Sequence, residues 1–125
     1  ATVIDVEVQG KDIKVHDAYV VLDCGTHINP DTCVAQMEGA VVFGLSLALK
    51  SEITFDKGSA VQGNLDTYEL IRMMESPRVT VDLVQSEALP AGVGEPGVPP
   101  VAPALTNAIF AASGQRIRKL PVSLA

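Results

Sequence analysis

The sequence of 125 residues predicts an α+β fold, in which a mixed or antiparallel β-sheet packs against two main helices. Residues 2–8 and 79–84 alternate apolar and polar side chains, as half-buried strands do. Residues 30–50 carry apolar side chains at helical spacing. Residues 104–112 lie between a proline and a glycine, which suits the two ends of a second helix. The length is close to that of one domain, so residues 1–125 are treated as a single domain.

The first two strands are expected to form an antiparallel hairpin. Residues 2–8 are followed by Gly10-Lys11-Asp12, which favours a turn, and then by a second extended run over residues 13–22. Because the second run ends on consecutive apolar residues, we expect that strand to become fully buried towards its end.

The first helix has a clear predicted start. Asn29 is a good N-cap, Pro30 is tolerated at the first helical position, and Asp31 suits the positive end of the helix. Gly39 and Gly44 lie inside the helix, where each costs about 0.8–1 kcal/mol relative to alanine. Close packing of another element and close approach of a ligand explain such glycines equally well.

Weaker signals cover the rest of the chain. Residues 51–56 are predicted to form a short strand and Lys57-Gly58 a turn, whereas residues 64–72 are ambiguous. After the second helix, residues 117–122 are predicted to form a closing extended segment.

Charge and ligand spacing argue against several functions. The formal net charge of −6 argues against nucleic acid, which is bound by neutralising its phosphates. Arg116, Arg118 and Lys119 form one basic cluster, for which a solvated rim is favoured over an anion site. Cys24 and Cys33 lack the spacing of a zinc or iron–sulfur site, and neither histidine has a ligand-spaced partner. The sequence therefore predicts no metal held by protein ligands.

Residues 92–97, Gly-Val-Gly-Glu-Pro-Gly, form the segment called here the glutamate loop. Its glycines match the dinucleotide fingerprint, but prolines delay the next helix and no acidic residue follows Glu95, so the nucleotide interpretation fails. The whole stretch 90–103 lacks polar linker residues, and we expect it to be ordered and packed. A carboxylate between Gly94 and Pro96 suits a general base, although the local sequence alone favours an ordinary surface turn.

Four groups of residues occur in a fixed order along the chain. They are Asp23-Cys24-Gly25 with Ile28-Asn29-Pro30; Gln36-Met37-Glu38-Gly39 with Gly44-Leu45; Tyr68 with Pro77; and residues 92–96 running into residues 104–110 and 116–121. Together they cover nearly the whole chain. They resemble the molybdopterin-binding large subunit of the xanthine dehydrogenase and aldehyde oxidase family, and especially its branch of isoquinoline 1-oxidoreductase beta subunits.

The resemblance implies roles for three residues. Glu95 matches the family's catalytic glutamate, Gly94 the glycine beside it near the metal, and Gln36 the glutamine that hydrogen-bonds the pterin. In this family molybdenum is held by the dithiolene of molybdopterin, here expected as the cytosine dinucleotide, and needs no protein ligand. Glu95 would remove the proton of a molybdenum-bound hydroxide while an aldehyde or an isoquinoline-like N-heterocycle is oxidised with oxygen from water.

The resemblance also implies partners. They are the remainder of the same large subunit, of which this chain would be the C-terminal part, an iron–sulfur small subunit and a small-molecule substrate. By itself the chain is expected to be inactive, to bind no cofactor and to self-associate. The alternative is a non-catalytic interaction domain that keeps the fold without the cofactor.

Overall fold

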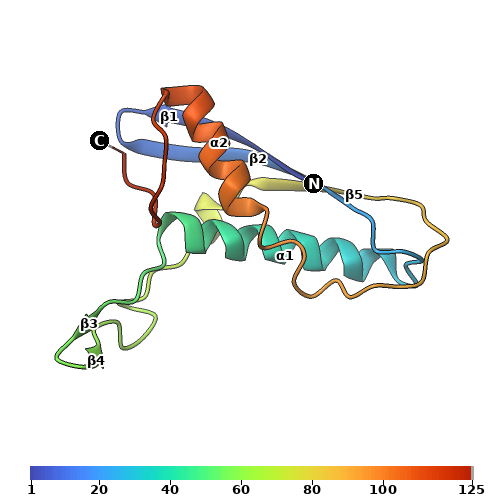
Figure 1. Ribbon diagram of the computed structural model, residues 1–125, viewed down its shortest axis with the longest axis horizontal. Coiled ribbons are helices and arrows are strands. Elements are labelled where there is room, and N and C mark those ends of the chain that lie inside the picture. The colour runs from blue at the N-terminus through green and yellow to red at the C-terminus, as the bar shows by residue number, and fades with distance from the viewer. Residues whose placement is uncertain (125) are drawn as a thin grey trace.

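Residues 1–124, which the computed structural model describes, form an α+β structure with one main sheet and two α-helices (Figure 1). This confirms the predicted fold class. In chain order the elements are β1 (Thr2–Gln9), β2 (Asp12–Leu22), α1 (Pro30–Leu49), β3 (Phe55–Asp56), β4 (Ser59–Ala60), the 3-10 helix η1 (Met73–Glu75), β5 (Arg78–Leu83) and α2 (Val101–Ser113).

The main sheet is mixed and has the strand order β1-β2-β5. β1 pairs antiparallel with β2, which confirms the predicted hairpin, and Gly10 in its turn has a φ of +61°. β2 pairs in parallel with β5, so that Asp17 lies opposite Arg78 and Leu22 opposite Leu83. The parallel pairing is possible because α1 lies between these strands in the sequence and returns the chain in the same direction.

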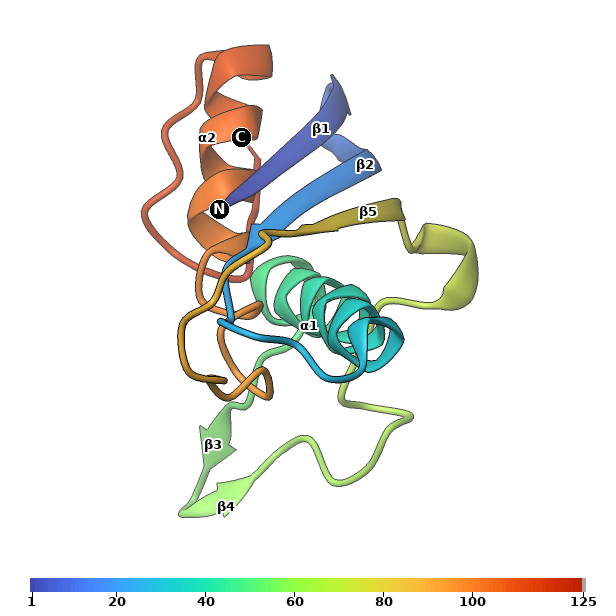
Figure 2. The same cartoon turned by 90° about the vertical axis from the view of Figure 1, so that its right-hand side faces the viewer.

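Both α-helices lie on the same face of the sheet (Figure 2). α2 packs against β1, α1 against β5, and the two helices pack against each other. Their buried apolar side chains meet those from the inner face of β1 and β2. This core includes Ile4, Val20, Val41, Leu45, Leu105 and Ile109.

The end of β2 corrects one expectation from the sequence. Tyr19 and Val21 are exposed, whereas Val20 between them is buried, so the strand does not become fully buried. In the part of the chain that the structure describes, no helix covers the outer face of the sheet, and Val3 of β1 is exposed there as well. Because successive side chains of a strand point to opposite faces, half of an apolar run stays outside.

α1 confirms the predicted first helix. The Asn29 side chain accepts a hydrogen bond from the Thr32 N–H at 3.2 Å, and Pro30 occupies the first turn. Among residues 1–124, α1 is the one helix that could cross a membrane by its length and composition. A helix in the core of a soluble protein passes the same test, and α1 lies against the sheet and α2.

The two glycines of α1 have different surroundings. A Cβ at Gly44 would lie 2.7 Å from the Cβ of Val101, so close packing of α2 requires this glycine. A Cβ at Gly39 would meet nothing within 4 Å. Of the two explanations for helix glycines, close packing within this chain therefore applies to Gly44 and not to Gly39.

α2 begins at Val101, earlier than the predicted start at residue 104. The prediction placed Pro103 ahead of the helix, but a proline fits within the first turn, where N–H groups have no acceptor in the helix. Gly114 ends the helix as predicted. It has a left-handed φ of 74°, and its N–H donates to the Phe110 carbonyl at 2.8 Å.

Residues 52–67 form an arm that extends away from the two helices (Figures 1 and 2). The arm contains the hairpin of β3 and β4, with Lys57 and Gly58 in its turn at φ values of 49° and 83°, which confirms the predicted turn. The strand predicted over residues 51–56 is shorter than expected, because only the two residues of β3 pair with β4.

The C-terminal segment also differs from its prediction. Residues 117–122 form no strand. The Val122 N–H instead donates to the carbonyl of Ala48 at 2.8 Å, and Leu124 is buried in the core. The segment therefore pairs with the end of a helix, where carbonyls lack partners, and not with a sheet edge.

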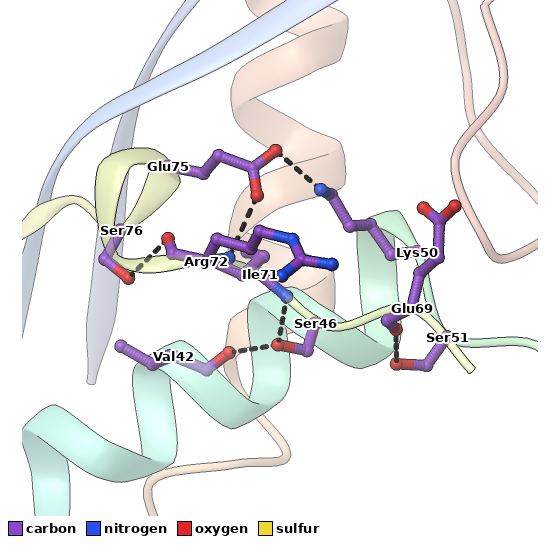
Figure 3. A network of polar contacts seen from close by, with 9 residues as sticks. All are labelled: Val42, Ser46, Lys50, Ser51, Glu69, Ile71, Arg72, Glu75 and Ser76. Atoms are coloured by element: carbon purple, nitrogen blue, oxygen red, sulfur yellow. Dashed lines mark hydrogen bonds and ion pairs between the residues drawn. The ribbon is translucent and has the colours of Figure 1, made fainter. Parts of the chain in front are cut away.

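A polar network joins residues 69–76 to the C-terminal half of α1 (Figure 3). At its centre lies Ser46, a buried polar residue in the middle of an apolar helix. Its hydroxyl donates to the Val42 carbonyl at 2.9 Å and accepts the Ile71 N–H at 3.1 Å. Both hydrogen-bonding functions of the hydroxyl are thus satisfied within the chain.

The outer part of the same network contains an ion pair. Lys50 binds one carboxylate oxygen of Glu75, and the other oxygen accepts the Arg72 N–H at 2.9 Å. The hydrogen bond from Lys50, followed by that from Arg72, lowers the pKa of Glu75 below its ordinary value. Ser51 adds a hydrogen bond from its hydroxyl to the Glu69 carbonyl at 3.0 Å.

Candidate active site

The glutamate loop ends in a tight turn that begins at Glu95. The Val98 N–H donates to the Glu95 carbonyl at 3.0 Å, which closes a four-residue turn. Pro96 occupies the second position of this turn, where its fixed φ is favoured. The backbone at Glu95 is therefore restrained by the residue that follows it. The chain then continues directly into α2.

Gly97 places this turn on α1. A Cβ at Gly97 would lie 2.5 Å from the Cβ of Ala40 and 3.0 Å from the Met37 sulfur, so only glycine fits. The loop therefore lies against α1 at Met37, the residue after Gln36 in the sequence, and at Ala40. The structure thus brings the segments of the three sequence-predicted site residues to one region, at the N-terminal half of α1.

The other end of the loop is held by a pair of backbone segments. The Thr26 N–H donates to the Ala88 carbonyl and the Ala91 N–H to the Cys24 carbonyl, both at 2.9 Å. Gly25 lies between these contacts with a φ of +73°, and a Cβ there would stand 2.2 Å from the Leu89 carbonyl oxygen. In Figure 1 the two segments run side by side beyond the sheet. The glutamate loop is thus held at both ends, which confirms that this proline-rich stretch is ordered.

The polar side chains of the candidate site have no partners of their own. Glu95 and Gln36 are both exposed. Within residues 1–124, neither side chain makes a hydrogen bond or an ion pair. The carboxylate and the amide are therefore available to a molecule outside this chain.

Gly94 leaves open space beside Glu95. A Cβ at Gly94 would meet nothing within 4 Å, and its φ lies outside the left-handed region. Neither packing within the chain nor backbone conformation requires a glycine here. A free amide, a free carboxylate and an open glycine fit a bulky heterocyclic cofactor that approaches the backbone closely.

One thiol, that of Cys24, lies on the segment that holds the loop, and the other, that of Cys33, lies in α1. Cys24 and Cys33 are both free and buried. Burial, and next the neighbouring Cys33, raises the pKa of the Cys24 thiol, which disfavours the thiolate needed for metal binding. Residues 1–124 contain no group of three or more His, Cys, Asp or Glu side chains that could hold a metal ion.

Sequence reasoning missed the residues that position the loop. Gly25, Thr26 and Gly97 make the contacts on its two sides. In the sequence, Gly97 stands out only as part of a glycine pattern, and Gly25 only as a member of the first group of residues that carries the family resemblance. Their partners lie about 60 residues away in the sequence, so no local signal predicts these contacts.

A family model described as a molybdopterin cofactor-binding domain matches residues 1–77. The matched region includes Gln36 and the whole of α1, and it ends before the glutamate loop. The family match therefore supports the fold and the helix of the candidate site independently of Glu95.

Two relatives extend the comparison. The chain is 41% identical over 103 residues to a membrane-bound aldehyde dehydrogenase from Gluconacetobacter polyoxogenes, and the match covers 82% of this chain and 13% of the relative. The name of this relative includes the cofactor pyrroloquinoline quinone. The chain is 36% identical over 110 residues to isoquinoline 1-oxidoreductase subunit beta from Brevundimonas diminuta, which covers 88% of this chain and 14% of the relative. The chain thus spans only 13–14% of the length of these relatives.

Solved structures share the fold. A crystal structure of Cu,Mo-CO dehydrogenase matches with a TM-score of 0.73 and 26% identity, over 82% of this chain and 14% of that one. Quinoline 2-oxidoreductase from Pseudomonas putida 86 matches with a TM-score of 0.73 over 88% of this chain and 15% of that one, and at 24% identity it shows the fold alone. These matches confirm the predicted resemblance, and both aldehyde- and isoquinoline-oxidising proteins are among the relatives.

Proposed function

Because the chain belongs to the molybdopterin cofactor-binding domain family, among the molybdenum enzymes of the xanthine dehydrogenase and aldehyde oxidase type, we propose that it supplies the catalytic base of a molybdenum hydroxylase. The base is Glu95. The observation that supports this role most is the glutamate loop, which is held at both ends and lies through Gly97 against Met37 and Ala40 of α1. A carboxylate on such a loop has a restricted direction, as a general base requires.

Gln36 and Gly94 are proposed to face the cofactor. The Gln36 amide offers both a donor and an acceptor to the edge of a pterin, and no group within residues 1–124 competes for it. Gly94 leaves the backbone beside Glu95 open to a bulky neighbour. When bound, the molybdopterin, which we propose to be the cytosine dinucleotide form, supplies the metal centre at which the substrate is oxidised with oxygen from water.

Glu95 acts on a proton. In its ionised form the carboxylate is an acceptor only, so Glu95 would take up the proton of the water-derived oxygen, while the two electrons of the substrate C–H bond that is broken would pass to the bound cofactor. This requires a carboxylate oxygen within ~2.6–3.2 Å of that oxygen in the reactive complex.

The substrate is proposed to be an aldehyde or an N-heterocycle of the isoquinoline type. The names of the two relatives support this class. Since the chain spans only 13–14% of those relatives, the remainder of a large subunit and an iron–sulfur small subunit are the proposed partners. Exposed apolar side chains such as Phe43, Leu65 and Leu89 support self-association when those partners are absent.

The test is Glu95→Gln in the assembled molybdenum enzyme. Loss of a general base lowers turnover by about 10²–10⁴-fold, while molybdenum and pterin content stay unchanged. Glu87→Gln is the matched control, because Glu87 is an exposed glutamate in the segment that leads to the same loop. It should leave turnover within about twofold.

Two results would contradict the proposal. Near-normal turnover of Glu95→Gln would remove this glutamate from the mechanism. Absence of both molybdenum and pterin from the native complex would instead identify a non-catalytic interaction domain. The same cofactor analysis should include pyrroloquinoline quinone, because the name of the first relative contains that cofactor.

A further inference from the structure

The basic cluster near the C-terminus lines a cavity of about 520 Å³. The cluster lies at the far end of α2 from the glutamate loop. Three cations within four residues therefore border one shared space, although each of them is also exposed to solvent. The lining residues are Glu52, Arg116, Ile117, Arg118, Lys119, Pro121, Val122 and Ser123.

Arg116 is held in place by α2. Its guanidinium carbon lies 3.5 Å above the centre of the Phe110 ring, and one N–H group donates to the side-chain amide oxygen of Asn107 at 3.5 Å. Stacking on an aromatic ring restrains the guanidinium while leaving N–H groups on its edge free. Arg118 makes a long contact of 3.4 Å with the neighbouring Ile117 carbonyl. Most donors of both arginines thus remain available.

The charges in the cavity are not balanced. Among the described residues of the lining, Arg116, Arg118 and Lys119 provide three positive charges and Glu52 is the one acidic side chain, which leaves a formal side-chain charge of +2. Within residues 1–124 none of the three cations makes an ion pair. The whole chain has a net charge of −6, so this positively charged site is opposite in sign to the chain as a whole. Like charges held together repel each other unless an anion lies between them.

We propose that this cavity is a binding site for a phosphate dianion, either free or as a small phosphomonoester. A phosphate group carries about −1.5 to −2 charge at neutral pH, which matches the formal charge of the cavity. Its three or four oxygens can accept from two guanidinium forks and an ammonium at once, whereas a carboxylate has two. The site is separate from the glutamate loop and does not depend on the proposed catalytic function.

The experiment titrates the full chain with inorganic phosphate, methyl phosphate and acetate at neutral pH. Backbone amide shifts in ¹H–¹⁵N spectra report where each anion binds, and calorimetry gives the affinity. Saturable shifts are expected at residues 116–119 with phosphate or methyl phosphate. Acetate should bind at least about tenfold more weakly, because it satisfies fewer charge-assisted hydrogen bonds. Tighter binding of inorganic phosphate would indicate a site for the free ion, and tighter binding of methyl phosphate would indicate a site for a phosphomonoester.

Three variants test the proposal, because each has a different expected effect on the affinity for phosphate. Arg118→Gln should weaken phosphate binding about tenfold or more, since one charge-assisted contact is lost. Glu52→Gln should tighten binding, because it removes the one negative charge of the lining. Lys57→Gln, the same charge change on the exposed turn of the arm, should leave the affinity unchanged. The opposite effects of the first two variants cannot both follow from a loss of folding.

Several outcomes would overturn the proposal. They are the absence of saturable phosphate shifts at residues 116–119, acetate binding as tightly as phosphate, and equal weakening by Lys57→Gln and Arg118→Gln. The last result would show a general charge effect and no specific site.

Discussion

The two halves of α1 differ in whether their polar side chains have hydrogen-bonding partners within the chain. In the C-terminal half, Ser46 and Lys50 are bound to residues 69–76, and each has a partner within the chain. In the N-terminal half, Gln36 exposes an amide, and the glutamate loop that packs on this half exposes a carboxylate; neither has a partner among residues 1–124. Polar groups that bind each other stabilise a fold, whereas exposed groups without partners in the chain are free to bind solvent or another molecule.

The largest effect that tests this comparison is expected at the glycines of α1. Gly44→Val should destabilise the chain by about 3 kcal/mol, because a Cβ there would lie 2.7 Å from that of Val101 on α2. Gly39→Ala should instead stabilise it by about 0.8–1 kcal/mol, since the space is open and alanine favours helix. Urea unfolding of both variants measures the difference. A destabilising Gly39→Ala would show that the N-terminal half is packed within this chain after all.

The next effect separates a structural polar residue from a binding one. Ser46→Ala should cost about 2 kcal/mol, because it leaves the Ile71 N–H without its acceptor. Gln36→Ala should change the free energy of unfolding by less than about 0.5 kcal/mol, as expected for an exposed side chain without partners. In the assembled enzyme the order should reverse, with Gln36→Ala losing more pterin. Equal effects on stability would remove the distinction between the two halves.

The smallest effect is the pH dependence of the Lys50–Glu75 pair. The pKa of Glu75 is lowered in the folded chain, so its contribution to stability is complete above about pH 4.3, the ordinary value, and is lost as the pH falls through the lower folded pKa. Because the pair is partly exposed, the contribution should stay below about 1 kcal/mol. Glu75→Gln should therefore lower stability at pH 7 and not at pH 2, with Glu87→Gln as the control. An equal loss at both pH values would exclude an electrostatic origin.

Local signals explain what could be predicted from the sequence. The N-cap at Asn29, the hairpin and the glycine at position 114 depend on neighbouring residues, and the structure confirms them. The parallel pairing of β2 with β5 joins residues that are 61 positions apart in the sequence, and so does the Arg78–Asp17 ion pair. No short sequence pattern predicts contacts over this separation. Glu95 and Gln36 could be named only through the family resemblance, because the local sequence around Glu95 favours an ordinary turn.

The two chain segments that pair as β2 and β5 also meet beyond the strands, where their partners run in the opposite order, and this affects how the chain can vary in length. Asp17 and Arg78 are 61 residues apart, and Thr26 and Ala88, which hold the glutamate loop, are 62 apart. A single closure of the chain therefore brings the sheet and the base of the loop together. Each doubling of such a closed segment costs only about 0.6 kcal/mol, so the arm can gain or lose residues in evolution at little expense to the site. A residue inserted between Ala88 and Ala91 has no such freedom, because both of these residues bind the segment of residues 24–26 and Leu89 between them packs on Gly25.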